Sequence, residues 1–279
     1  MASRIMPALN KKVTAMSETQ AEPQISGKMF LFEKPELLNK DLHGNIGVGR
    51  PEQIYGFCAK VRAVPITLGE VTSVMRDYPI VLMSEENPLP LAVTGIIDDV
   101  NLFVDDKGNW EENVYIPGYV RRYPFGVAAE TDGDRMAIVI DRAFTGFVDG
   151  GEQRLFDGDN VSEFTQQAID FTKAFEQDRV QTQRAADVLK SYGLVSGQTA
   201  QYTPQGSTEQ KSFAQYFGID EQKFNALSDD QFLELRKSNL LPAIYAQLMS
   251  QGNWRTLMLR RARRFNLTEA NITEARTLS

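Results

Sequence analysis

The sequence is poor in the residues that carry most enzyme chemistry, with one cysteine, Cys58, and one histidine, His43. A lone cysteine excludes an internal disulfide and any metal cluster held by several thiolates. Cys58 lies in the apolar stretch YGFCA, which favours a buried, inert thiol over a nucleophile. A histidine-based triad has to use His43, and no neighbour completes a nucleophile–base pair. We therefore interpret His43, in the glycine-rich segment DLHGNIGVG, as a turn residue rather than a catalytic one.

Long hydrophobic runs and an excess of basic residues are also missing. No apolar run reaches the roughly 18–20 residues that span a bilayer, so we expect no transmembrane segment. Lys11 and Lys12 interrupt the N-terminal apolar stretch, which excludes a typical secretory signal and makes a cytoplasmic location the default. Residues 1–28 read as a flexible leader. The net charge of −7 and the pI near 5.0 argue against a nucleic-acid partner.

What the sequence does contain predicts an α+β fold. Residues 29–157 are β-rich, and residues 158–266 have helical spacing, as in the apolar seam Phe164, Ala168, Phe171 and Phe175. We expect a mixed or antiparallel N-terminal half with a helical C-terminal half packed on it, in the same or a closely packed domain, and a polar tail over residues 267–279. Residues 196–211 are polar and turn-rich, which predicts an exposed loop.

Two copies of an Arg-x-Tyr-Pro box, residues 76–79 and 121–124, are the most distinctive local feature. Each box precedes a strand-like run, a polar turn and a second strand-like run. In the first copy these are residues 80–83, SEENP and 89–97, and in the second they are residues 125–129, TDGD and 135–141. The sequence therefore predicts two box-plus-hairpin units.

The box side chains allow two interpretations. As architectural corners, the tyrosines bury their rings with hydrogen-bonded hydroxyls, and the arginines pair with carboxylates such as Asp141. As a ligand site, the same groups hold an anionic or peptide ligand. We favour the corners. The candidate ligand- or partner-binding residues are His43, Arg76, Tyr78, Tyr115, Arg121, Arg122, Tyr123 and Arg261.

Arg261 belongs to a predicted basic amphipathic helix over residues 254–265, a candidate partner contact whose simpler interpretation is a docked helix with a solvated face. The acidic pairs, such as Asp98-Asp99 and Asp105-Asp106, fall at turns, where aspartate is favoured without a metal. We therefore expect no metal site and no cofactor, and we assign no catalytic residue.

Several segments together resemble the bacterial SapC family: LNKDLHGNIGV, RAVPITLGEV, RDYPIVL, YIPGYVRRYPFGV, MAIVID and, late in the chain, LSDDQFLELRKSNLLPAIYAQLMSQGNWRTL. The similarity runs from residue 39 to residue 257, and YIP-x3-RRYPF is its most specific part. The family takes its name from association with surface-layer proteins, and the resemblance carries over no catalytic residues.

The resemblance implies a non-enzymatic interaction or assembly protein, which associates with itself or with a protein partner and reaches the surface layer by a route that needs no signal peptide. The alternative is an enzyme, or an accessory protein for substrate uptake or modification. Its Tyr/Arg-lined pocket would bind a small molecule or a peptide.

Overall fold

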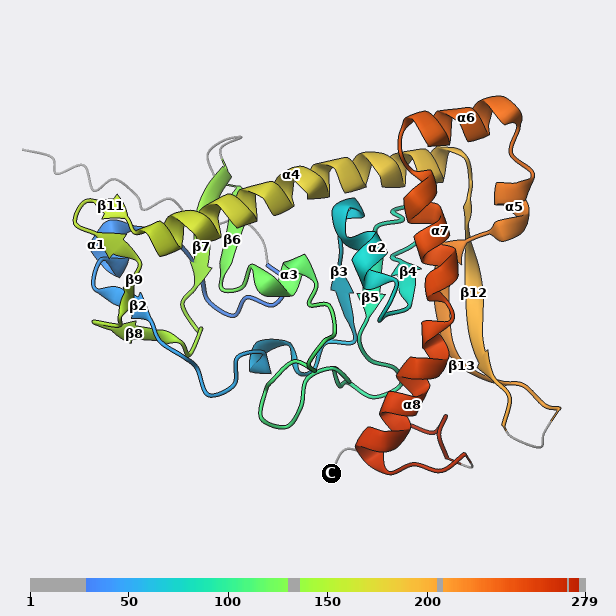
Figure 1. The fold of residues 1–279 in the computed structure, drawn as a ribbon, viewed down its shortest axis with the longest axis horizontal. Helices are drawn as coiled ribbons and strands as arrows, with labels where there is room; N and C mark the ends of the chain where they lie inside the picture. Colours follow the sequence, from blue (N-terminus) through green and yellow to red (C-terminus); the bar gives the residue numbers. More distant parts are fainter. Residues whose placement is uncertain (1–28, 130–135, 205–207, 270, 276–279) are drawn as a thin grey trace, which may run out of the picture.

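The computed structural model describes residues 29–129, 136–204, 208–269 and 271–275 (Figure 1). The expected leader over residues 1–28 and the turn at residues 131–134 lie outside these ranges. The predicted α+β class is confirmed, because antiparallel sheets dominate the N-terminal half and long helices the C-terminal half. The helices and strands below determine where the two boxes lie in the fold.

The largest sheet is antiparallel, with the strand order β12-β13-β4-β5-β3. Its strands are β3 (Ala63–Pro65), β4 (Ile80–Leu82), β5 (Pro90–Val93), β12 (Val195–Tyr202) and β13 (Lys211–Ile219). The two three-stranded sheets are β1-β7-β6, from β1 (Pro35–Leu37), β6 (Phe125–Ala129) and β7 (Met136–Asp141), and β8-β2-β9, from β2 (Ile46–Val48), β8 (Phe147–Asp149) and β9 (Gln153–Arg154). A short pair joins β10 (Phe156–Asp157) to β11 (Asn160–Val161).

Short helical turns precede the long helices of the C-terminal half. The short ones are α1 (Lys40–His43), η1 (Gly56–Cys58), η2 (Leu68–Glu70), α2 (Val71–Val74) and α3 (Gly118–Arg121). The later ones are α4 (Glu163–Ser191), α5 (Glu221–Asn225), α6 (Asp229–Lys237), α7 (Leu241–Ser250) and α8 (Asn253–Phe265).

Both predicted hairpins are present. The first box runs into the antiparallel pair β4–β5, and the second runs into β6–β7. Helix α2 ends two residues before the first box, and α3 ends at Arg121, the first residue of the second box. The β-branched and aromatic residues after each proline favour strands, so the local sequence is sufficient to predict both units.

Helix α4 runs along the top of the molecule, from the small strands near β11 to the end of the sheet at β12 (Figure 1). It begins at the N-cap Ser162, whose hydroxyl accepts a hydrogen bond from the backbone N–H of Thr165. The buried face includes Thr165, Ile169, Thr172 and Phe175. In the first turns of α4, each buried residue therefore lies one position after a residue of the predicted apolar seam. The prediction and the buried face coincide at Phe175.

The predicted loop over residues 196–211 is wrong in its first half, because these residues form most of β12. Glutamine, threonine and serine suit an edge strand whose backbone is satisfied by a neighbour. The neighbour is β13, paired from Val195↔Ile219 to Tyr202↔Lys211. This hairpin joins the sheet of the N-terminal half, so strands from both halves of the chain share one sheet.

The helix signals of the C-terminal half are confirmed. Ser228 and Gln231 form the reciprocal capping box at the start of α6. Pro242 lies in the first turn of α7, where its missing N–H costs no helical hydrogen bond. In Figure 1, α7 and α8 follow one another along one side of the sheet.

Candidate functional site

The first box forms a buried corner. The side chain of Tyr78 is fully buried, its hydroxyl donates to the carbonyl of Tyr115, and its ring centroid lies 4.5 Å from that of Phe103. Burial raises the pKa of Tyr78 above the usual value for a phenol. Arg76 is exposed, and its Nε donates to the carbonyl of Ser73 at 3.4 Å. Tyr78 is therefore engaged inside the fold, whereas Arg76 faces solvent.

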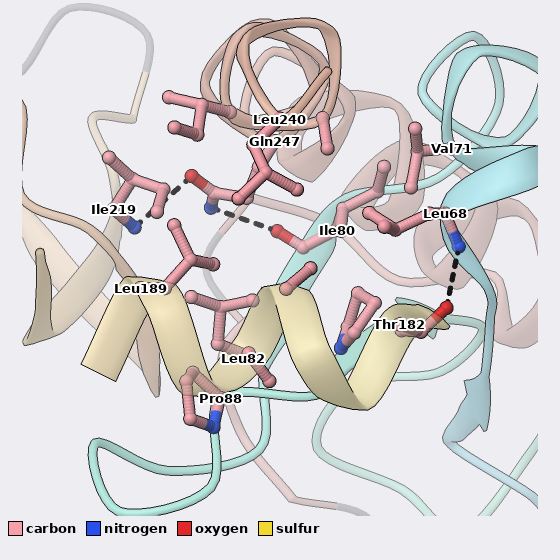
Figure 2. A pocket seen from close by; sticks show the side chains of 15 residues that line it. Leu68, Val71, Ile80, Leu82, Pro88, Thr182, Leu189, Ile219, Leu240 and Gln247 are labelled. Carbon is pink, nitrogen blue, oxygen red and sulfur yellow. Dashed lines mark hydrogen bonds between the residues drawn. The ribbon is translucent and has the colours of Figure 1, made fainter. Parts of the chain in front are cut away.

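The amide side chain of Gln247, on α7, holds the strand that follows this box (Figure 2). Strands β13 and β4 pair at the single position Phe217↔Leu82. Next to it, Gln247 spans both strands: its Nε2 donates to the carbonyl of Ile80 at 3.1 Å, and its Oε1 accepts from the N–H of Ile219 at 3.2 Å. The side chain thus replaces ladder hydrogen bonds where the two strands diverge.

The junction of α7 and α8 completes this anchor. Ser250 Oγ accepts from the N–H of Ile80 at 2.9 Å. Asn253 Nδ2 donates to the carbonyl of Met75 at 2.7 Å and to that of Tyr78 at 3.0 Å. The first box and the start of β4 are therefore the part of the fold to which the α7–α8 junction is hydrogen-bonded.

The second box is centred on a buried carboxylate. Asp141 is fully buried, and its Oδ2 accepts from the hydroxyl of Tyr123 at 3.0 Å. The backbone N–H groups of Glu33, Lys34 and Ala143 donate to the same carboxylate at 2.9, 2.9 and 3.0 Å. Burial and the negative charge of Asp141 raise the pKa of Tyr123. The expected arginine partner is replaced by this tyrosine and the three amides.

Arg122 ties the second box to helix α4. Its side chain is buried, and Nη1 donates to Oε1 of Glu176 at 3.2 Å. The guanidinium carbon lies 4.0 Å from the ring centroid of Tyr119 and 5.0 Å from that of Phe175. Glu176 also accepts from Arg179 Nε at 2.6 Å. The charge of Arg122 is thus used within the fold.

Glu70, which sequence reasoning missed, links the two box regions. Its Oε2 accepts from the hydroxyl of Tyr115 at 3.0 Å and from the N–H of Gly118 at 2.7 Å. Its Oε1 accepts from the N–H of Thr67 at 2.9 Å, in a capping box. Burial and the Glu70 charge raise the pKa of Tyr115. The exposed Arg121 donates through Nη2 to the same hydroxyl at 3.0 Å.

The last two candidates lie apart from the boxes. His43 is buried in α1: its Nδ1 accepts from the N–H of Asn39 at 3.0 Å, and its Nε2 lies 3.2 Å from Oε2 of Glu36. Arg261 is fully buried in α8, and its Nε donates to Oδ2 of Asp98 at 2.8 Å. Helices α1 and α8 lie far apart in Figure 1, so the candidates do not form one site.

The described part of the tail is packed rather than free. Arg261 donates to the backbone carbonyls of Ile272 and, at 2.7 Å, Glu274. The side chain of Ile272 is buried. The basic helix thus uses its one buried arginine to fasten the segment that follows it.

Tyr123 also lines an open hollow of about 650 Å³. Phe57 stacks on Tyr123 with ring centroids 3.8 Å apart, and Phe144 meets it edge-on. Arg50 and Glu52 add charged groups to the lining. The hollow contains one tyrosine of the boxes and an arginine that lies outside them.

A second cavity, of about 30 Å³, lies between α4, α7 and the sheet (Figure 2). Its lining is almost entirely apolar, with Leu68, Leu82, Leu189, Leu240 and Ile244 among the residues. The volume is far below the roughly 150 Å³ of an apolar cavity that binds benzene, and apolar cavities of this kind stay dry. It is a packing gap rather than a ligand pocket.

The described residues hold no group of three or more histidine, cysteine, aspartate or glutamate side chains arranged to bind a metal ion. No helix among them has the length and apolar character needed to cross a membrane.

The comparison with protein families agrees with the resemblance carried by the sequence segments. The comparisons with curated proteins and with solved structures found no match. The sequence model of the SapC family matches residues 38–257, which is most of the chain. The chain, with its two box corners inside the matched region, belongs to the SapC family.

Proposed function

We propose that the chain is a non-enzymatic interaction and assembly protein associated with the surface layer. The observation that carries the proposal is that buried side chains of the two boxes are bonded to other parts of the same chain. Tyr78, Arg122 and Tyr123 fasten the chain's own helices and strands together, with hydrogen bonds to Tyr115, Glu176 and Asp141. A ligand that used these groups would have to displace buried intramolecular bonds, each of which is costly to break.

An apolar cluster on α6 and α7 supports the association role. Phe232, Tyr245 and Met249 are 38%, 42% and 68% exposed. The buried ring of Phe224 joins two of them, with centroids 6.0 Å from Phe232 and 5.7 Å from Tyr245. Clustered exposed apolar side chains are typical of protein contacts. We call these three residues the α6–α7 patch.

Cell fractionation tests the surface-layer part of the proposal. In the native host the full chain is expected in the surface-layer extract, and a Tyr245→Ser/Met249→Ser variant is expected to leave that fraction with little change in melting temperature. Val180→Ser is the matched control, because Val180 is an isolated exposed apolar side chain, 42% exposed, on α4. A wild-type chain found wholly in the cytosolic extract contradicts the proposal.

The hollow beside Tyr123 favours a second candidate function, an accessory protein that binds a small molecule or peptide. Arg50, Glu33 and Glu52 offer charged groups beside the aromatic rings. Mass spectrometry of protein purified from the host tests it. This candidate predicts a co-purifying molecule that Arg50→Ala removes and that Arg76→Ala, at an exposed arginine elsewhere, retains. Wild-type protein free of any such molecule contradicts it.

A further inference from the structure

Within the part of the chain that the structure describes, strand β12 leaves one edge of the largest sheet open. It is the terminal strand in the order β12-β13-β4-β5-β3, and in the described ranges it pairs with β13 alone. Figure 1 shows the β12–β13 hairpin running well beyond the short strand β4. An open edge presents a row of backbone donors and acceptors that another strand can pair with.

This edge lacks the features with which proteins usually block such pairing. Residues Val195–Tyr202, VSGQTAQY, contain no charged residue and no proline. The register shift between Ala200 and Gln201 lies toward the hairpin tip, so residues 195–200 form an uninterrupted edge. Six residues extend about 20 Å. Lysine, proline or a central bulge is the ordinary protection, and none falls in this stretch.

We infer that the outer edge of β12 pairs antiparallel with β12 of a second copy of this chain, which joins two five-stranded sheets into one. The inference rests on the proposed function and names its partner. A two-fold axis near Gln198 places β12 of one copy against β12 of the other, so that both copies contribute the same surface, as an isologous contact requires. Because β12 itself carries no charged residue, pairing it with a second copy sets no two like charges of the strand opposite each other, although each chain carries a net charge of −7.

The same lack of charge argues for a copy over a charged partner segment, which would find no counter-charge along residues 195–200. The attraction comes from hydrogen bonds between the backbones of the two strands. The exposed side chains of Thr199 and Gln201 lie on the same strand. An edge contact of this length falls at or below about 1,200 Å² of buried surface. We therefore expect a weak dimer, whose fraction rises with the protein concentration.

Sedimentation velocity on the full chain, from about 1 to 200 μM, tests the inference with two matched lysine variants. Thr199 is exposed on β12, and Gln215 is its register partner on β13, exposed on the same face but one strand inward. Thr199→Lys places two ammonium groups on one face of the joined sheet and is expected to weaken dimerisation up to about fivefold. Gln215→Lys adds the same charge away from the edge and leaves the dimer constant almost unchanged.

Hydrogen exchange at low and high concentration provides the second readout, since every second backbone N–H group of residues 195–200 points away from β13 and becomes protected only as dimer forms. Equal effects of the two lysine variants overturn the edge inference. A dimer that Met249→Ser disrupts and Thr199→Lys leaves intact also overturns it, while the proposed function stands. A monomer throughout the concentration range, with no concentration-dependent protection, overturns it as well. Surface-layer fractionation then tests the proposed function by itself.

Discussion

Gln247 gives the sharpest test of how the first box is anchored. The side chain is 3% exposed and bridges β4 and β13 through the carbonyl of Ile80 and the N–H of Ile219. Glutamate has the same shape. When protonated it retains one donor and one acceptor and reproduces both bonds, but when ionised it has acceptors only and faces the Ile80 carbonyl. The stability of Gln247→Glu therefore depends on pH.

Burial disfavours the ionised form, so the pKa of the introduced carboxyl is raised in the folded chain above its unfolded value of about 4.3. Between those two pKa values the folded state binds more protons than the unfolded state, so the unfolding free energy falls as pH rises. A rise of about two pKa units gives a deficit relative to wild type of about 1.6 kcal/mol at pH 5.5 and about 2.7 kcal/mol at pH 8.

Urea denaturation of wild type, Gln247→Glu and Gln247→Met between pH 5.5 and 8 measures this, above the pI near 5.0. The methionine variant retains the volume but leaves the N–H of Ile219 without its acceptor. Its deficit is expected to be about 2–3 kcal/mol at every pH. A Gln247→Glu variant that matches wild type across the whole range refutes the bridging role.

Three substitutions and one labelling experiment test other parts of the fold. Arg122→Ala removes a buried guanidinium and its bond to Glu176, which keeps Arg179 as a partner, and is expected to cost about 2–3 kcal/mol in urea denaturation; Tyr123→Phe removes one of the four described donors to a buried carboxylate and costs about 1 kcal/mol. Unchanged stability in both, with a lost ligand or partner, would reverse the corner assignment. Arg261→Ala is expected to lower the melting temperature by several degrees, whereas Arg263→Ala on the exposed face of the same helix leaves it unchanged. Burial raises the pKa of Cys58 to about 12, so the native thiol is expected to resist iodoacetamide at pH 8 and to react once urea unfolds the chain; fast labelling of native protein contradicts this.

Local patterns were sufficient to predict the two hairpins and the long helices. The runs after Pro79 and Pro124 favour strands on their own, and Ser228 with Gln231 marks the start of α6 within four residues of sequence. Strand β12 shows the opposite case. Its glutamine and threonine residues resemble a loop, and only the distant fit of β13 against β4 places the hairpin in the sheet.

The candidate residues were recognised as distinctive, but their partners depend on the tertiary fold. Arg122 meets Glu176 on a helix 54 residues away, and Gln247 meets Ile80 at a separation of 167 residues. Spacing along the chain carries no signal for contacts of this kind. Glu70 is different, because Thr67 and Glu70 have the spacing of a capping box and mark the position of this carboxylate in the sequence itself.

Native mass spectrometry of the full chain purified from its host tests the central claim most directly, that this SapC-family protein works by association. The account predicts a dimer or a stoichiometric complex with a second protein, whose mass includes no small molecule. A clean monomer at every concentration, or a monomer that carries a bound small molecule, would contradict it.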